Sequence, residues 1–272
     1  MKRTFDFKIA CIGAGPSNLS VAAALEDQAP WLAAQTIILE RDEKIAWQPG
    51  QLIEGTLSQV HHCKDLATLR DPTSRFTFLN YLKTEGRLDD FINMGRNTPY
   101  RFEVSDYHAW AAYQLRHVDL RLGNGVRRVV PIRSKQGICG WEIETETGER
   151  ITSRHLICSV GRALNVPEPL RRLGSDRVVH CANYLPAIES WSHPDPQKIA
   201  IIGASQSSAE VAIDCGARFP DAKRVLIMRS IGMASYESSK HTNELFFPGY
   251  VDKFNGLEAK DRRSVINQMH RA

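Results

Sequence analysis

Residues 59–65, QVHHCKD, bring together side chains that can move protons, bind metals and hold anions. His61 and His62 carry imidazoles, which can accept protons or bind metals, and Cys63 carries a thiol, which can act as a nucleophile or a metal ligand. The ammonium of Lys64 suits an anionic group such as a carboxylate. We expect no metal here, because adjacent residues of a strand point to opposite faces and no fourth ligand follows nearby. The histidines are predicted either to line a binding pocket or to be simply packed or exposed.

A glycine-rich turn near the start of the chain indicates a dinucleotide site. KIACIG predicts a buried strand, GAGPSNLS a turn that opens a helix, and QTIILER a second strand. The glycines let the backbone approach a pyrophosphate, which the helix N-terminus attracts through its free N–H groups. The acid that ends the second strand can accept hydrogen bonds from ribose hydroxyls. The residues expected around this nucleotide are Gly13, Gly15, Pro16, Ser17, Asn18 and Glu40.

The same order of elements returns in the second half of the chain. KIAIIG, ASQSSAEVAIDCGARF and KRVLIMRS predict a strand, a helix and a strand. An arginine closes this unit, and a guanidinium suits a bidentate hold on a 2′-phosphate, which favours NADPH over NADH. Plain helix capping by the serines and a solvated arginine are the alternatives. The residues expected around the second nucleotide are Gly203, Ser205, Gln206, Ser207 and Arg229.

Two dinucleotide units in one chain predict an α/β oxidoreductase with two Rossmann-like domains, one holding FAD tightly and one binding a diffusing hydride donor. We place the FAD-binding domain at residues 1–192 and an incomplete NADPH-binding domain at 193–272, joined through the proline-rich WSHPDPQ. Residues 47–117 are predicted to be a mainly helical insert that builds the substrate pocket.

The details of that insert follow from helix-start and strand signals. The Asp-Pro pair at residues 71–72 is expected to open one helix, and Ser105 or Asp106 to cap another. GNGVRRVVPI and WEIETETGERITS are predicted to form a small β-meander.

The composition argues against other classes of protein. The 272 residues carry a net charge of +4, and Lys and Arg are scattered, so a nucleic-acid partner is not expected. No apolar run reaches the roughly 18–20 residues of a membrane span, and no signal-type segment precedes the first strand. The six cysteines form no CxxC pair and lie mostly in apolar runs. We therefore expect a cytoplasmic protein with reduced thiols and no membrane partner.

Three stretches carry a family resemblance: GAGPSNLS, the segment from Ala46 to Trp110 that includes KDLATLRDPTS, and RSIGMASYESSKHTNELFFPGY. Together they resemble the flavin-dependent L-ornithine and L-lysine N-monooxygenases of siderophore biosynthesis, over nearly the whole chain and closer to the ornithine branch. The resemblance implies hydroxylation of the side-chain amine of L-ornithine or L-lysine with FAD, NADPH and O₂, through a flavin C4a-hydroperoxide. It also implies a homo-oligomer, often a tetramer.

The resemblance also implies roles for single residues. Lys64 falls where the family uses a lysine near the substrate carboxylate, and Asn243 falls where an asparagine helps to hold the substrate backbone. Gln59 falls beside the flavin, and Trp47 falls in the loop that packs near the isoalloxazine. No protein nucleophile is expected; His61 or His62 as a proton acceptor is a further hypothesis.

Two departures from the family pattern leave alternatives open. The chain has QPGQ after Trp47 and HHC before Lys64, where the family pattern has HPGM and Ser-Phe-aliphatic, so the pocket wall is expected to be more polar. The chain also ends at SVINQMHRA, whereas family members continue further, so we expect a fragment or a natural truncation. A monooxygenase of another amine, an acidic amino acid or a sulfide, an uncoupled flavin reductase, and a non-catalytic nucleotide-binding module are the alternatives.

Overall fold

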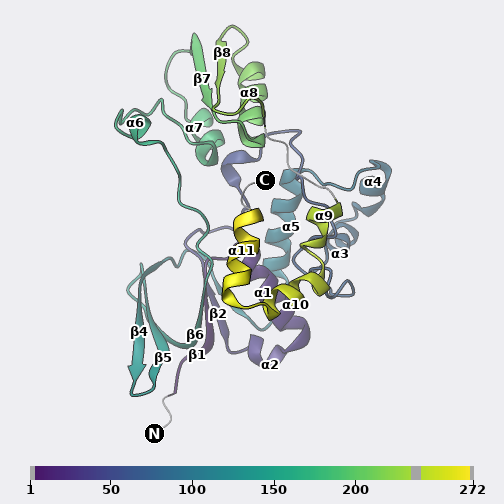
Figure 1. The fold of residues 1–272 in the computed structure, drawn as a ribbon, viewed down its shortest axis with the longest axis vertical. Helices are drawn as coiled ribbons and strands as arrows, with labels where there is room; N and C mark the ends of the chain where they lie inside the picture. Colours follow the sequence, from purple (N-terminus) through teal and green to yellow (C-terminus); the bar gives the residue numbers. More distant parts are fainter. Residues whose placement is uncertain (1–3, 234–239, 270–272) are drawn as a thin grey trace. The chain divides into compact units, whose positions relative to one another are not determined.

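A computed structural model describes residues 4–233 and 240–269 of the chain. The chain divides into two compact units (Figure 1). The first unit is Met1–Trp47 with His62–Ala163, and the second is Gln48–His61 with Leu164–Ala272. Residues 48–61 therefore group with the second half of the chain. The domain boundary expected after residue 192 stays a prediction.

The first unit is built on a six-stranded sheet of order β3-β2-β1-β6-β5-β4. The strand β1 pairs in parallel with β2 and β6, and β2 pairs in parallel with β3. The strands β4, β5 and β6 are antiparallel, so the predicted meander is confirmed and its last strand joins the parallel part of the sheet. The strands are β1 Phe7–Ile12, β2 Thr36–Leu39, β3 Asp119–Arg121, β4 Val126–Ser134, β5 Gly137–Thr145 and β6 Arg150–Cys158.

The helix α1, Pro16–Gln28, connects β1 to β2, with the short helix α2, Pro30–Ala33, between them. All four residues of β2 are buried, as is typical of a central parallel strand. The helix packs small side chains, Ala22 and Ala23, into the cores around it. The predicted strand–helix–strand arrangement is confirmed here, and it places the glycine turn at the carboxyl end of β1.

The segment predicted as a helical insert contains three longer helices, and two of the predicted starting points were wrong; its role as a substrate insert stays a prediction. The helix α3 is Phe78–Thr84 and begins after the cap residue Thr77, because residues 71–76 form turns. The helix α4 is Leu88–Asn93 and α5 is Arg101–Tyr113. Ser105 and Asp106 therefore lie inside α5, whose start is fixed instead by the Glu103 carboxylate accepting from the Tyr100 N–H at 2.9 Å.

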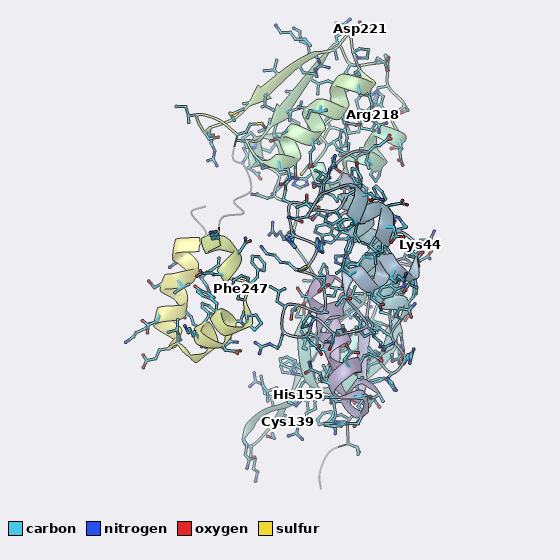
Figure 2. The ribbon with its side chains drawn as sticks, turned by 90° about the vertical axis from the view of Figure 1, so that its right-hand side faces the viewer. Lys44, Cys139, His155, Arg218, Asp221 and Phe247 are labelled. Carbon is cyan, nitrogen blue, oxygen red and sulfur yellow. The ribbon has the colours of Figure 1, made fainter. Side chains whose placement is uncertain are left out.

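The second unit contains the second strand–helix–strand arrangement, which is confirmed. The strand β7, Lys198–Ile202, pairs in parallel with β8, Lys223–Ile227, and α8, Gln206–Arg218, connects them. Arg218 at the end of α8 lies 2.7 Å from the Asp214 carboxylate (Figure 2). The remaining helices of this unit are η1 Pro49–Gln51, α6 Glu168–Arg171, η2 Cys181–Asn183, α7 Tyr184–Glu189, α9 Lys240–Glu244, α10 Pro248–Gly256 and α11 Ala259–Met269.

Close backbone packing explains why residues 48–61 belong to the second unit. Gly50 in η1 lies so close to η2 that a Cβ atom there would meet the Ala182 carbonyl. Ile53, Tyr184 and Cys215 then form a small core between this segment, α7 and α8. Only glycine fits at position 50, so the WQPG turn is part of the packing of this unit.

Two expectations drawn from composition concern cysteines and membranes. All six cysteines are free thiols; Cys11 and Cys215 are buried, whereas the other four are half-buried or exposed, so the expectation of core thiols holds for two of them. Among the helices formed by the described residues, none is both long and apolar enough to cross a membrane. The cytoplasmic location stays a prediction.

Candidate nucleotide and substrate sites

The glycine turn of the first unit combines one constrained glycine and one open one. Gly13 has a φ of +88°, and a Cβ atom there would lie 2.6 Å from the Ser159 carbonyl oxygen. Gly15 has an ordinary φ of −72° and no atom within 4 Å of an added Cβ. Gly15 precedes α1, whose first turn carries free backbone N–H groups at Ser17 and Asn18 and no acidic side chain. This open, electropositive turn has the form that a pyrophosphate requires.

Asn18 ties the first turn of α1 to the glycine turn that precedes it. Its side chain is fully buried, and its Nδ2 donates to the carbonyls of Ile12 at 3.0 Å and Gly13 at 2.7 Å. Its Oδ1 has no hydrogen-bond partner among the described residues. The asparagine therefore fastens the turn from the inside, a role that its spacing alone did not indicate. Its predicted contact with a nucleotide stays a prediction.

Glu40 lies beside the same turn, directly after β2. One carboxylate oxygen accepts from the Ala14 N–H at 2.6 Å, and the other accepts from the Asp42 N–H at 3.0 Å. Each oxygen has two lone pairs, so the side chain retains acceptor capacity for ribose hydroxyls. The acid thus fixes the turn, and its contact with an adenosine ribose stays a prediction.

Trp47 is held by two residues of α5, Ser105 and His108, to which sequence reasoning gave no role beside Trp47. Its backbone N–H donates to the hydroxyl of Ser105 at 2.9 Å, and its ring meets the edge of His108 at 5.6 Å. His108 is buried, and desolvation lowers the pKa of its imidazole to about 4. The imidazole is therefore neutral at physiological pH. The sequence signal that could have pointed to His108 is a polar residue among the apolar residues of the buried face of α5.

The segment that carries Lys64 is fastened on its C-terminal side. The Asp65 carboxylate accepts from the Phe78 N–H at 2.8 Å, at the first residue of α3. The Leu66 N–H donates to the Tyr107 hydroxyl at 2.9 Å, and the Leu66 carbonyl accepts from the Ser20 hydroxyl at 2.7 Å. Asp65 and Leu66 thus form an anchor that fastens the chain next to Lys64 to the helices α1, α3 and α5.

Burial gives this anchor and Lys64 unusual proton affinities. Lys64 is half-buried, and desolvation lowers the pKa of its ammonium. Desolvation also raises the pKa of Asp65 to about 6, although the N–H groups of Phe78, Ala67 and Thr68 act in the opposite direction. The neighbourhood of Lys64 is therefore one in which a charge is poorly hydrated, and an anionic ligand would compensate the ammonium there.

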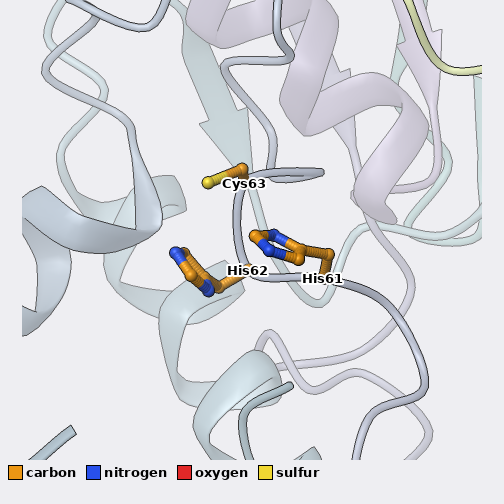
Figure 3. Close-up of side chains that lie close together, drawn as sticks. All are labelled: His61, His62 and Cys63. Atoms are coloured by element: carbon orange, nitrogen blue, oxygen red, sulfur yellow. The ribbon is translucent and has the colours of Figure 1, made fainter. Parts of the chain in front are cut away.

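Residues 61–63 lie in a turn and not on a strand, so the premise on which we excluded a metal was wrong. The side chains of His61, His62 and Cys63 lie close together around the turn (Figure 3). One donor atom from each lies within 4.8 Å of the others, and all three residues are half-buried. Burial, and then the charge of Asp65, raise the pKa of the Cys63 thiol. The expectation that no metal binds stays a prediction.

The glycine turn of the second unit differs in detail from the first. Gly203 has a φ of +144°, and Ser205 stands at the N-terminus of α8 without capping it through its side chain. The Ser207 hydroxyl donates to Gln51 at 3.1 Å, and the Gln206 amide donates to the Leu57 carbonyl at 3.3 Å. Two of the residues predicted to contact the nucleotide therefore donate hydrogen bonds to the 48–61 segment.

The remaining predicted site residues are accessible or half-buried. Arg229 is exposed and follows β8 by two residues, as expected for a strand-end cation. Gln59 is exposed in the 48–61 segment, and Asn243 is half-buried in α9. The proposed roles of these three side chains toward nucleotide or substrate stay predictions.

Comparisons with known proteins agree with this arrangement. Residues 4–272 match the family model described as L-lysine 6-monooxygenase/L-ornithine 5-monooxygenase. The chain is 34% identical over 267 residues to the L-ornithine N(5)-oxygenase of Arthrobotrys oligospora, covering 96% of this chain and 55% of that protein. It is 33% identical over 267 residues to the L-ornithine N(5)-monooxygenase of Pseudomonas aeruginosa, covering 95% of this chain and 60% of that protein. The chain thus spans a little over half the length of these relatives.

Solved structures show the same fold. The ornithine hydroxylase of Pseudomonas aeruginosa matches with a TM-score of 0.84 and 32% identity, over 97% of this chain and 64% of that one. The ornithine N-hydroxylase of Kutzneria sp. 744, described with reduced FAD, NADP⁺ and L-ornithine, matches with a TM-score of 0.84 and 28% identity, over 96% of this chain and 62% of that one. The predicted α/β fold is confirmed. The chain belongs to the L-lysine 6-monooxygenase/L-ornithine 5-monooxygenase family.

Proposed function

We propose that this chain carries out, or forms part of the enzyme that carries out, N-hydroxylation of the side-chain amine of L-ornithine with FAD, NADPH and O₂, as a step in making a hydroxamate siderophore. The observation that carries the proposal is the fixed, half-buried position of Lys64, held through Asp65 and Leu66. A cation placed in this way suits the carboxylate of an amino acid. Membership of the family supports the reaction type.

The first unit fits FAD. The open space at Gly15 admits a pyrophosphate, the N–H groups of Ser17 and Asn18 would meet its charge, and Glu40 would accept from the ribose. We place the isoalloxazine near Trp47, with Gln59 as a further contact. When bound, FAD and NADPH supply the hydride transfer and oxygen activation that no protein side chain can perform.

The second unit fits NADPH. Gly203 opens the turn before α8, and the helix N-terminus at Ser205 and Gln206 would face the pyrophosphate. Ser207 would contribute a hydroxyl in the same turn. Arg229 is exposed, so its guanidinium can take a 2′-phosphate without breaking a core contact. This is the difference by which we assign NADPH rather than NADH to the second unit.

The protein's own task is to position the substrate and control its protons. Lys64 would bind the α-carboxylate and Asn243 would bind the amino-acid backbone, so the side-chain amine points away from both. That amine must be neutral to react, and an alkylammonium has a pKa near 10, so a poorly hydrated pocket must favour deprotonation. His61 or His62 would accept the proton in this proposal. Exclusion of water would also protect the activated oxygen.

The choice of substrate, the location and the oligomeric state in this proposal are supported by the family and not by the geometry of the site. We favour ornithine over lysine, because the first relatives matched are ornithine enzymes. We also propose a cytoplasmic homo-oligomer, in keeping with the resemblance. A non-catalytic nucleotide-binding module is the second candidate, favoured by the altered segment at residues 61–63, where the family pattern has Ser-Phe-aliphatic.

A product assay tests the proposal. The purified 272-residue chain is incubated with FAD, NADPH, O₂ and equal amounts of ornithine and lysine, and the masses of the products are measured by mass spectrometry. We expect one added oxygen on ornithine. Bound flavin with no oxygenated amine would contradict the enzyme and support the non-catalytic module.

Lys64 is tested in the same assay by Lys64→Met. Loss of a charged hydrogen bond to the carboxylate, about 1.5–3 kcal/mol, predicts a KM for ornithine raised roughly 10- to 100-fold with FAD binding unchanged. Lys83→Met is the matched control, because Lys83 is exposed on α3. An unchanged KM in Lys64→Met would remove Lys64 from the substrate site.

A further inference from the structure

The His-His-Cys cluster, residues 61–63, is absent from the family pattern and has no part in the nucleotide sites. One donor atom from each side chain lies within 4.8 Å of the other two (Figure 3). Because the three residues are consecutive, two peptide bonds keep their backbone atoms close together, and the side-chain rotamers set the distances between the donor atoms. Convergence of this kind is unusual for neighbours in a chain, since an extended backbone would send them to opposite sides.

The donor set has the chemistry of a transition-metal site. Imidazole nitrogen and thiolate sulfur are the donors that Zn²⁺ prefers, with bond lengths of about 2.0–2.1 Å and about 2.3 Å. A tetrahedral ion with these bonds places its donors about 3.3–3.6 Å apart. The observed upper limit of 4.8 Å exceeds that spacing by about 1.2–1.5 Å, so the side chains must rotate toward one another for one ion to bind all three.

The backbone around His62 supplies the support that metal-binding histidines usually have. The carbonyl of Asn97 accepts from the backbone N–H of His62 at 3.0 Å and lies 3.0 Å from its Nδ1. A carbonyl only accepts, so Nδ1 carries the proton and Nε2 carries the lone pair. The ring is also held by an edge contact with Phe91 at 5.4 Å. A histidine oriented by a carbonyl on one nitrogen is poised to bind a cation through the other.

We propose that His61, His62 and Cys63 bind a single Zn²⁺ ion, with Nε2 of His62 as one ligand and a water molecule in the fourth position. Three protein ligands and one open position is the arrangement of an accessible site rather than of a closed structural one. The ion would lie beside the residue before Lys64. Zinc binding would therefore add positive charge next to the lysine that we assign to the substrate carboxylate. It would also occupy the imidazoles of His61 and His62, so the metal-bound form could not use either one to accept the amine's proton.

Direct metal binding tests the site without reference to activity. The 272-residue chain, freed of metal by a chelator and fully reduced, is titrated with Zn²⁺ by calorimetry and with Co²⁺ by absorbance. We expect one ion per chain and a thiolate-to-cobalt charge-transfer band. Loss of an outer partner of a ligand weakens metal binding about 10- to 100-fold, so we expect Cys63→Ser and His61→Gln each to weaken it at least about 100-fold. Cys63→Ser should also abolish the charge-transfer band.

Matched controls separate the cluster from other thiols and imidazoles. Cys139→Ser changes a half-buried thiol on β5 and His155→Gln an exposed imidazole on β6, both labelled in Figure 2, and neither should alter binding. His61→Gln keeps the thiol, so it tests the site if Cys63→Ser does not fold. Absence of a stoichiometric ion in the wild-type chain would overturn the proposal. Retention of the charge-transfer band in Cys63→Ser, or of wild-type affinity in His61→Gln, would overturn it as well.

Discussion

The two strand–helix–strand regions share a local plan but differ in how the chain surrounds them. In the first, β2 is buried at all four positions and sits in a six-stranded sheet. In the second, β8 exposes four of its five residues in a two-stranded sheet. Similar local patterns therefore gave similar local structures, whereas burial was decided by distant segments of the chain.

The residues that end the two regions show the same contrast. Glu40 is tied by hydrogen bonds to Ala14 and Asp42, so its carboxylate is preorganised beside the glycine turn. Arg229 is exposed beyond the end of β8. A preorganised site binds with less loss of conformational freedom, which suits a tightly held nucleotide in the first region and an exchanging one in the second.

Replacing the turn glycine of each region with alanine should give the largest difference in stability loss between the two regions. Gly13→Ala combines a left-handed backbone with a Cβ atom 2.6 Å from the Ser159 carbonyl oxygen, so we expect a loss of about 3–5 kcal/mol in the free energy of unfolding. In Gly203→Ala the nearest atom is Ser208 Cβ at 3.4 Å, which leaves only backbone strain of about 1–2 kcal/mol. Denaturant unfolding measures both, and equal losses would contradict the contrast.

Acid should destabilise the first unit through the buried imidazole of His108. The pKa of His108 falls from 6.5 to about 4 on burial. Between these two pH values the unfolded chain therefore binds a proton at this imidazole and the folded chain does not. The free energy of unfolding falls by about 3 kcal/mol as the pH drops from 6.5 to 4, and it levels off below pH 4. His108→Phe should remove that part of the pH dependence, measured by unfolding between pH 7 and pH 4. The exposed His155→Phe is the control, and an unchanged profile in His108→Phe would disprove the assignment.

Arginine at the end of the second region should set nucleotide preference. Arg229→Gln removes the charged partner of the 2′-phosphate, so we expect NADPH affinity to fall roughly 10- to 100-fold while NADH affinity and FAD affinity stay the same. The exposed Arg177→Gln in the same unit serves as the control. Fluorescence titration with both nucleotides makes the measurement. Equal weakening of NADPH and NADH would show that Arg229 does not read the phosphate.

Gly15→Ala should have the smallest effect and the most specific one. An added Cβ meets no protein atom within 4 Å and the backbone φ is ordinary, so stability should change by less than about 0.5 kcal/mol. The methyl group would nevertheless occupy the approach of the pyrophosphate, and we expect roughly tenfold weaker FAD binding. Unfolding and FAD titration separate the two effects. Unchanged FAD affinity would move the pyrophosphate away from this turn.

The sequence predicted the elements whose signals are local. The strands and helices around Gly13 and Gly203 follow from apolar runs broken by glycine, and the structure has them where expected. The start of α5 was missed, because Ser105 and Asp106 have the chemistry of caps while the actual start depends on Glu103 reaching back to Tyr100.

Contacts between distant residues could not be read from the sequence. The buried carboxylate of Glu26 accepts from the backbone N–H groups of Arg116, His117 and Val118, about ninety positions away. A lone glutamate in an apolar helix gives no sign of its partners. The turn at residues 61–63 was likewise mistaken for a strand, because its conformation depends on the contact between His62 and the Asn97 carbonyl.

The two nucleotide sites are tested most directly by the flavin spectrum of the purified chain during anaerobic mixing with NADPH or NADH. We expect about one FAD per chain, bleached by NADPH at least roughly tenfold faster than by NADH at equal concentration, because Arg229 selects the 2′-phosphate. A chain that holds no flavin when FAD is supplied would contradict the assignment of the first region. Equal rates of bleaching with NADPH and NADH would contradict the assignment of the second.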